Sequence, residues 1–195
     1  MRLMKIGLFF GSFNPVHIGH LAMANYFIEF SDLDRVWMIV SPQNPFKSKN
    51  DLLPENDRYQ MVEKTLSDDH EISVSDIEFK LPKPSYTIDT LNYLKKSYNN
   101  HEFVLIIGSD NLKYFHKWKN HEELINNYEI YVYPRLGYDH NKYADKYPLT
   151  LVDAPFIEIS SSFVRSAIAE GKDVRYFVPQ EAYRYIKKMH LYEKQ

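Results

Sequence analysis

Two histidines spaced three residues apart, His17 and His20, lie near the start of the chain in the segment Gly11–His20. The apolar run Ile6–Phe10 before this segment predicts a buried parallel strand, and Leu21–Phe27 after it predicts a helix. A helix N-terminus offers free backbone N–H groups and the positive end of the helix dipole, both of which suit phosphate. Histidines at such a turn can donate hydrogen bonds to phosphoryl oxygens without a metal or a covalent nucleophile. The pattern therefore indicates transfer of a nucleotidyl group.

Two other roles are open to the same histidine pair. The side chains could cap the helix, or they could ligate zinc. Zinc needs at least a third protein ligand, and the sequence close to this loop offers no Asp, Glu or Cys partner. The chain contains no cysteine, which excludes a disulfide framework, a thiolate zinc site and a cysteine nucleophile.

A second group of polar residues lies in Ile159–Arg165, where three serines open a predicted helix and an arginine follows one turn later. Serine at a helix N-cap is ordinary structure, and that interpretation is open for Ser161 and Ser162. Arg165 adds a guanidinium over the first turn, which matches the charge and the geometry of a polyphosphate. The segment is therefore a candidate polyphosphate site.

Three further segments place polar groups at strand ends or helix starts. Ser41–Lys47 follows the second strand, Pro84–Thr90 begins a helix with a capping hydroxyl, and Ile106–Asn111 ends a strand in Gly-Ser-Asp. Each of them alone is typical of a turn or a helix start. Trp118, a little further on, could be a core residue or could offer its face to a flat ring.

Strands and helices are expected to alternate along the chain. We predict strands near Met4–Phe10, Arg35–Val40, Glu71–Val74, Phe103–Ile107 and Glu129–Tyr133. We predict helices near Ile18–Phe30, Glu55–Leu66, Thr87–Tyr98, Glu122–Asn126, Ser161–Glu170 and Gln180–Met189, with Gly171 suited to cap the fifth of them. This alternation predicts an α/β fold: a Rossmann-like, doubly wound parallel sheet with right-handed crossovers and a C-terminal helical segment. Ligands of such sheets bind at the carboxyl ends of the strands, where the candidate loops lie.

Length and composition narrow the classes of protein. A chain of 195 residues is expected to form one domain over residues 1–195. The net charge of -2, with both signs mixed, argues against a nucleic-acid partner. No apolar stretch is long enough for a membrane span, and the N-terminal apolar run is short, contains Lys5 and lacks a small-residue cleavage site. We therefore expect a cytoplasmic protein. The patterns G-x-x-x-x-G-K-[ST] and G-x-G-x-x-G are absent, which disfavours a P-loop kinase and a dehydrogenase of the usual kind.

Together, His17-Ile18-Gly19-His20 and Ile159-Ser160-Ser161-Ser162-Phe163-Val164-Arg165 resemble the two motifs of the nucleotidyltransferase α/β phosphodiesterase superfamily. Within it, the chain is most similar to the bacterial nicotinate-nucleotide adenylyltransferases. The segments that carry this closer likeness are Ser85–Leu91, Ile107–Asp110, His116–Trp118, Val178-Pro179, Tyr185-Ile186 and Leu191-Tyr192. The chain departs from the family at Phe10, where a glycine is common, and at Asn14, where an aspartate is common.

The resemblance implies that ATP and nicotinate mononucleotide react to give nicotinate adenine dinucleotide and pyrophosphate, a step of NAD biosynthesis. It implies that ATP is bound by the loop residues Gly11, Ser12 and Phe13, by His17 and His20 at the phosphates, by Gly108 and Asp110 at the ribose, and by Ser161, Ser162 and Arg165 at the β- and γ-phosphates. His17, His20 and Arg165 would be the catalytic residues.

For the second substrate, the resemblance implies Asn44 and Lys47 beside the mononucleotide phosphate, backbone amides near Tyr86 and Thr87 at the nicotinate carboxylate, and Trp118 against the pyridine ring. The mononucleotide phosphate is already anionic, so no general base is needed. Mg²⁺ would come with ATP rather than sit in a metal site of the protein.

Three alternatives stay open. The chain could be another adenylyl- or cytidylyltransferase of the superfamily, with a pantetheine-phosphate or nicotinamide mononucleotide substrate. It could be a fragment of a class I aminoacyl-tRNA synthetase, although it lacks a Lys-Met-Ser-Lys-Ser segment and a basic surface signal. It could also be a non-catalytic nucleotide sensor. The sequence leaves the oligomeric state open, a homo-oligomer included.

Overall fold

A computed structural model describes residues 2–43, 52–139, 141–143 and 146–194. Its centre is a six-stranded sheet in the order β3-β2-β1-β4-β5-β6, in which every neighbouring pair is parallel. The strands are β1 Met4–Gly11, β2 Arg35–Val40, β3 Ile72–Ser75, β4 His101–Gly108, β5 Glu129–Tyr133 and β6 Thr150–Leu151. The first five match the predicted strands to within two residues at each end, and the short β6 was not predicted.

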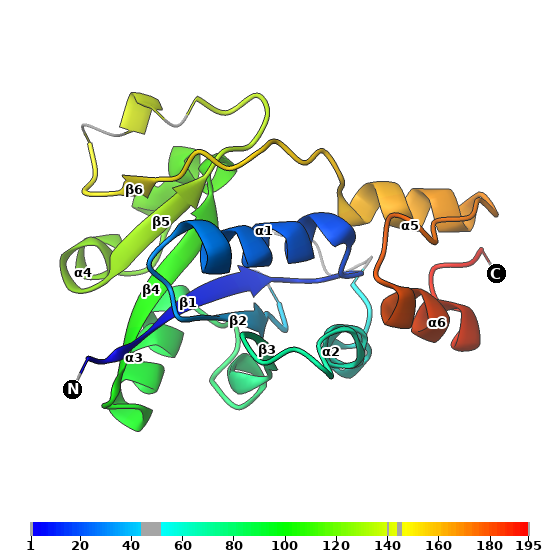
Figure 1. Ribbon diagram of the computed structural model, residues 1–195, viewed down its shortest axis with the longest axis horizontal. Coiled ribbons are helices and arrows are strands. Elements are labelled where there is room, and N and C mark those ends of the chain that lie inside the picture. Colours follow the sequence, from blue (N-terminus) through cyan, green and yellow to red (C-terminus); the bar gives the residue numbers. More distant parts are fainter. Residues whose placement is uncertain (1, 44–51, 140, 144–145, 195) are drawn as a thin grey trace.

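Helices cover both faces of this sheet, which explains the continuous apolar runs of the central strands (Figure 1). On β1, Phe9 faces one core, while Ile6 and Leu8 face the other. The first core is closed by α1 Ile18–Phe30, α2 Glu55–Thr65, α5 Ser161–Ala169 and α6 Gln180–Lys188. The second is closed by α3 Thr87–Ser97, the 3₁₀ segment η2 Ser109–Lys117 and α4 His121–Asn127. The predicted doubly wound α/β architecture is confirmed.

The ends of α5 follow from its sequence. Ser160 is the N-cap, and its Oγ accepts a hydrogen bond of 3.1 Å from the N–H of Phe163. Gly171 follows the C-cap at a φ of +74°, a backbone conformation that glycine adopts without strain. Two bonds close this end, from the N–H of Gly171 to the oxygen of Ile168 and from the N–H of Lys172 to the oxygen of Ala167. Gly171 is therefore the helix cap that the sequence predicted.

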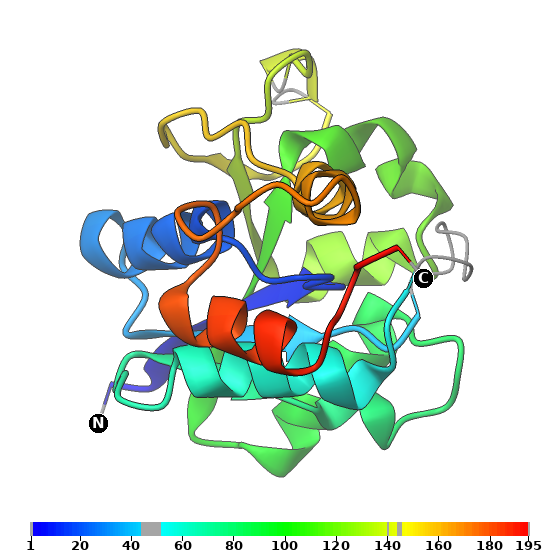
Figure 2. The ribbon, with the colours of Figure 1, turned by 90° about the vertical axis from the view of Figure 1, so that its right-hand side faces the viewer.

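The topology decides where a ligand can bind. The chain moves from β1 outward through β2 and β3, then returns to the other side of β1 for β4, β5 and β6. The direction thus reverses between β1 and β4, and an open α/β sheet binds its ligand at such a point, beyond the carboxyl ends of the strands. Figure 2 faces these ends, with α5 and α6 in front of them.

Among the described residues, no helix is long and apolar enough to cross a membrane. The expectation of a cytoplasmic location stays a prediction.

Candidate active site

A cavity of about 390 Å³ lies beyond the carboxyl ends of the central strands, a size typical of small-molecule sites. Its walls come from the β1–α1 turn, from the residues that follow β4 and β5, and from the segment that leads into α5. Predicted site residues among its lining are His17, His20 and Asp110; other lining residues include Phe9, Gly19, Tyr133, Arg135, Tyr138, Glu158 and Ser160. A second cavity, of about 420 Å³, lies between α5 and α6 and contains none of the predicted site residues.

His17 and His20 form a stacked pair at the start of α1. Their ring centroids are 3.6 Å apart and the ring planes are inclined by 22°. The backbone N–H of His17, the N-cap residue, donates to Nδ1 of His20 at 3.2 Å. His20 therefore helps to cap the helix, as the first alternative interpretation proposed. A side chain at Gly19 would place its Cβ 3.1 Å from Nδ1 of His17, so the glycine makes room for the imidazole.

The environment keeps His17 neutral at neutral pH. Its exposed fraction is 4%, and its buried Nδ1 has no hydrogen-bond partner among the described residues. Burial lowers the pKa of His17 to about 4, and the positive charge of Arg135 contributes to this shift. An anion bound nearby would raise the pKa of His17 and favour its protonated form. The buried imidazole and the positive charge of Arg135 therefore both suit an anionic ligand.

The side chain of Phe13, a predicted ATP-binding residue, is buried within the loop. Its buried ring packs edge-on against His20, with centroids 5.0 Å apart, and against Phe9 at 6.1 Å. A Cβ at Gly11 would come within 2.7 Å of the same ring, so the glycine lets Phe13 fold back over the strand end. The ring supports His20 from behind, and contact between Phe13 and ATP would have to use the main chain.

The start of α5 meets the loop between β1 and α1, although the two motifs are far apart in the sequence. Oγ of Ser161 donates to the oxygen of Pro15 at 2.9 Å. Arg165 donates through Nη1 to the oxygen of Asn14 at 2.9 Å and through Nη2 to Oγ of Ser162 at 3.4 Å. The two predicted phosphate motifs are therefore neighbours. Ser160 lines the cavity, whereas Ser161, Ser162 and Arg165 are not among its lining residues.

Asn14, which departs from the family pattern, has a clear structural role. Its Oδ1 accepts hydrogen bonds from the N–H of Leu53 at 3.3 Å and from the hydroxyl of Tyr192 at 2.8 Å. An aspartate oxygen could accept the same two bonds. The asparagine therefore preserves these contacts of the loop and removes one negative charge.

At the end of β4, Gly108 and Asp110 lie against Arg135. A Cβ at Gly108 would clash with Oδ1 of Asp110 and would approach Cγ of Arg135 to 3.1 Å. Nε of Arg135 lies 3.7 Å from Oδ1 of Asp110, and the two side chains share a wall of the cavity. Sequence reasoning missed Arg135. Its signal was an arginine two residues after the predicted strand Glu129–Tyr133, at the same sheet edge as the other candidates.

Comparison with known proteins shows the family to which the chain belongs. Residues 8–167 match the model of the cytidylyltransferase-like family. The chain is 50% identical over 193 residues to the probable nicotinate-nucleotide adenylyltransferase of Flavobacterium johnsoniae, covering 98% of this chain and 100% of the relative. It is 51% identical over 178 residues to the protein of the same name from Cytophaga hutchinsonii, covering 91% and 93%. The chain belongs to the nicotinate-nucleotide adenylyltransferase family.

A solved structure gives the same fold. Plasmodium falciparum nicotinic acid mononucleotide adenylyltransferase, complexed with NaAD, superimposes with a TM-score of 0.81 at 20% sequence identity, over 96% of this chain and 97% of that one. The predicted family, fold class and enzyme class are confirmed.

In this adenylyltransferase, the residues predicted to bind the nicotinate moiety lie outside the cavity that contains the histidines. Tyr86 and Trp118 pack against the second core. Tyr86 is the N-cap of α3, and its side chain makes no capping hydrogen bond. Trp118 is half-buried against Phe115, with ring centroids 5.3 Å apart. Nζ of Lys119 lies 4.9 Å from the ring centroid of Tyr86, which connects the two segments. Tyr86, Thr87 and Trp118 do not line the cavity, and Asn44 and Lys47 lie outside the described residues.

Nucleotidyltransferases generally use a divalent metal. In the part of the chain that the structure describes, no cluster of three or more His, Cys, Asp or Glu side chains could hold one. The described cavity offers histidines, a serine hydroxyl and a guanidinium, which can bind phosphate oxygens, together with the carboxylates of Asp110 and Glu158.

Proposed function

We propose that this protein transfers the adenylyl group of ATP to nicotinate mononucleotide, releasing pyrophosphate and forming nicotinate adenine dinucleotide. The observation that carries the proposal is the meeting of the His17–His20 turn with the start of α5 beside one cavity, in a chain of this family. The phosphate oxygen of the mononucleotide forms a bond to the α-phosphorus of ATP, and the bond from that phosphorus to the pyrophosphate oxygen breaks. No proton has to be removed from the attacking phosphate.

The residues act by position and by charge. His17 and His20 contact the α-phosphoryl oxygens, where negative charge builds up. Ser161, Ser162 and Arg165 hold the β- and γ-phosphates that leave. The weak bond of 3.4 Å between Arg165 and Ser162 can be exchanged for a phosphate oxygen, while the bond to Asn14 keeps the guanidinium in place. Mg²⁺ enters with ATP as part of that substrate.

The α3 start supports the choice of the acid substrate. Its first-turn N–H groups are not capped by Tyr86, and a helix start favours an anion. N–H donors there can satisfy both oxygens of a nicotinate carboxylate. Facing nicotinamide, one donor would meet an NH₂ group and stay unpaired, which costs about 1–3 kcal/mol.

The test is pyrophosphate release from saturating ATP with each mononucleotide in turn. We expect kcat/KM for nicotinate mononucleotide to exceed that for nicotinamide mononucleotide by roughly tenfold to a hundredfold. Trp118→Ala should harm both substrates alike, because the indole faces the ring common to both. Tyr114→Ala is the matched control, since Tyr114 is an exposed aromatic of the neighbouring η2. Equal values for the two mononucleotides, or a preference for the amide, would reject the acid-selective pocket.

A further inference from the structure

Arg58, on α2, is the largest completely buried side chain among the residues that the structure describes, with an exposed fraction of 0%. Its four hydrogen bonds all go to main-chain oxygens: Nε to Leu53 at 2.9 Å, Nη1 to Ser12 at 2.6 Å and to Ser41 at 2.8 Å, and Nη2 to Pro42 at 2.9 Å. No carboxylate among the described residues forms an ion pair with it. Within the described residues, the guanidinium is therefore a buried cation whose hydrogen bonds go to the backbone, while the charge of Glu55 attracts it through space.

The carbonyls that Arg58 binds come from three segments at the carboxyl edge of the sheet. Ser12 belongs to the loop that carries the histidines, Ser41 and Pro42 follow β2, and Leu53 precedes α2. The N–H of Ser41 also donates to the oxygen of Gly11 at 2.9 Å, which joins the first two segments directly. One planar group with five donors thus sets the distances between these segments.

Side chains of α5 also donate hydrogen bonds to the loop that carries the histidines. Arg165 donates to the oxygen of Asn14 and Ser161 to that of Pro15, while Arg58 donates to that of Ser12. A carbonyl dipole aimed at the site would repel a triphosphate. These three oxygens belong to residues that lie two or more positions before His17 in the chain. Each of them instead points toward a side chain of α2 or α5.

The hydrogen bonds of Arg58 have a structural role, because an apolar residue would leave four buried main-chain oxygens without a donor. Burying a charge costs free energy unless hydrogen bonds or an opposite charge compensate it. Burial lowers the pKa of Arg58, yet an arginine stays protonated in proteins, so the charge is permanent. Its location beside the histidine loop gives the charge a use, because it adds a fixed positive potential where an anion is expected.

We propose that Arg58 is a positioning residue for adenylyl transfer, which fixes the loop that carries His17 and His20 and supplies a permanent charge behind it. This inference rests on the proposed function. Arg58 touches neither substrate, and it acts through the backbone of the loop. Its effect should therefore appear in kcat, and the preference for nicotinate should be unchanged, because the start of α3 is not among the segments that it holds.

The experiment compares Arg58→Lys and Arg58→Met in steady-state pyrophosphate release, well below the melting temperature of each variant. Lysine keeps the charge but lacks the planar fork, so we expect about a tenfold loss of kcat. Methionine loses both charge and donors, and we expect roughly a 10²-fold loss, which is the scale of a misplacement by about 1 Å. Lys64→Met is the matched control, because it removes an exposed charge from the same helix and should leave kcat unchanged.

A double-mutant cycle with His17→Ala separates positioning from general damage. If Arg58 acts through the histidine loop, Arg58→Lys should cost clearly less in the His17→Ala background than in the wild type. Full multiplication of the two losses, or a kcat of Arg58→Lys equal to that of the wild type, would overturn the inference while leaving the adenylyltransferase function intact. A wild-type protein that releases no pyrophosphate with any mononucleotide would instead reject the proposed function, and the role of Arg58 with it. If Arg58→Met does not fold, the Arg58→Lys cycle alone decides.

Discussion

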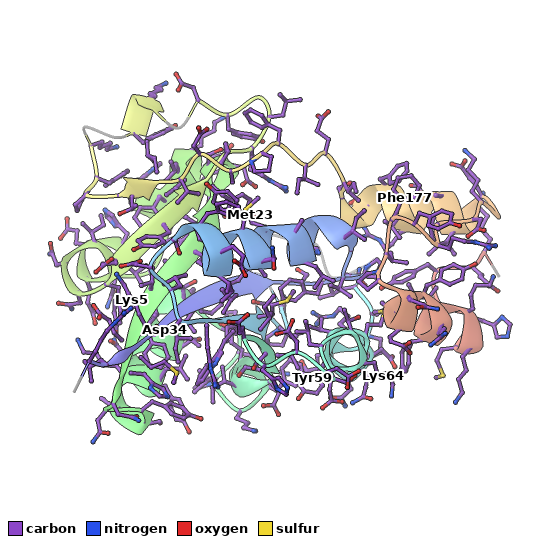
Figure 3. The ribbon with its side chains drawn as sticks, in the orientation of Figure 1. Lys5, Met23, Asp34, Tyr59, Lys64 and Phe177 are labelled. Carbon is purple, nitrogen blue, oxygen red and sulfur yellow. The ribbon has the colours of Figure 1, made fainter. Side chains whose placement is uncertain are left out.

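Lys5 and His17 are buried at opposite ends of the sheet, and the fold treats these two side chains in opposite ways. At the amino end, Lys5 is buried and donates to Asp32 at 2.7 Å, to Glu129 at 2.8 Å and to Tyr131 at 3.2 Å. At the carboxyl end, Nδ1 of His17 is buried without a partner among the described residues. Figure 3 shows this separation: Lys5 lies at one end of the molecule, and Phe177, whose oxygen accepts from the first N–H of α1, lies at the other.

The directions of the pKa shifts express the same contrast. Burial acts to lower the pKa of Lys5, but its hydrogen bonds to Asp32, Glu129 and Tyr131 raise that pKa well above its ordinary value. Burial lowers the pKa of His17 to about 4, and no partner restores it. The amino end therefore compensates its buried charge within the fold. At the carboxyl end the fold satisfies Arg58 but leaves the imidazole of His17 uncompensated, which is typical of a group that faces a ligand.

Replacing either histidine at the carboxyl end of the sheet should greatly reduce the catalytic rate. We expect His17→Ala and His20→Ala each to lower kcat by about 10²-fold or more, as for the loss of other donors that stabilise developing charge. Both variants should fold, since neither ring belongs to the two hydrophobic cores that hold the sheet and its helices together. Steady-state pyrophosphate release and thermal melting measure the two effects. Wild-type turnover in either variant would remove that histidine from the mechanism.

The sequence predicted the local half of this site and missed the half that depends on tertiary structure. The His17–His20 turn and the start of α5 were found because each is a contiguous motif on a predictable element. Their roles in binding stay predictions. Arg58 lies in the polar stretch Glu55–Gln60, a pattern that predicts exposure. It is buried because loops that follow β1 and β2 close over it, and no pattern within α2 records their approach.

The same distinction applies to the fold. Buried central strands such as β2 were predicted to the residue, because a run of apolar residues defines them. The two-residue β6 carries no pattern of its own and exists through its pairing with β5. The 3₁₀ segment η2 was also missed. Its buried Leu112 and Phe115 are three residues apart, but they stand among polar neighbours over too short a span to predict a helix.

Acid should distinguish the two ends by the pH at which each loses stability. For His17, the unfolded chain binds a proton near pH 6.5, while the folded chain does so only near pH 4. The unfolded state therefore holds more protons between these values, so stability falls as the pH falls through this window, by up to about 1.4 kcal/mol per pH unit and roughly 3 kcal/mol in all. Lys5 and Tyr131 hold the pKa of Asp32 below its ordinary 3.8 against the opposing effect of burial, so that network weakens only in stronger acid.

Urea unfolding from pH 4 to 7 measures this dependence, and His17→Gln is the variant that isolates it. Glutamine does not titrate, so the free energy of unfolding of the variant should fall less steeply toward acid than that of the wild type. The other titrating groups are common to both proteins, and their contributions cancel in the difference. Parallel curves for the two proteins would contradict a depressed pKa at His17.

Disrupting the amino end should affect stability alone, and by the smallest amount. Lys5→Met keeps the apolar stem and leaves Asp32 and Glu129 without their shared cation. Both carboxylates are about half exposed, with side-chain exposures of 57% and 48%, so water can solvate them after the change. We therefore expect the free energy of unfolding to fall by about 1–2 kcal/mol, toward the lower part of the range for hydrogen bonds to charged groups. Lys80→Met, which removes an exposed ion pair with Asp76, is the control and should cost less than about 1 kcal/mol.

Because Lys5 lies at the opposite end of β1 from the histidine turn, kcat of Lys5→Met should stay at the wild-type value. A drop in kcat without a matching loss of folded protein would show that the two ends are coupled through β1, and the division between a structural end and a functional end would then be wrong.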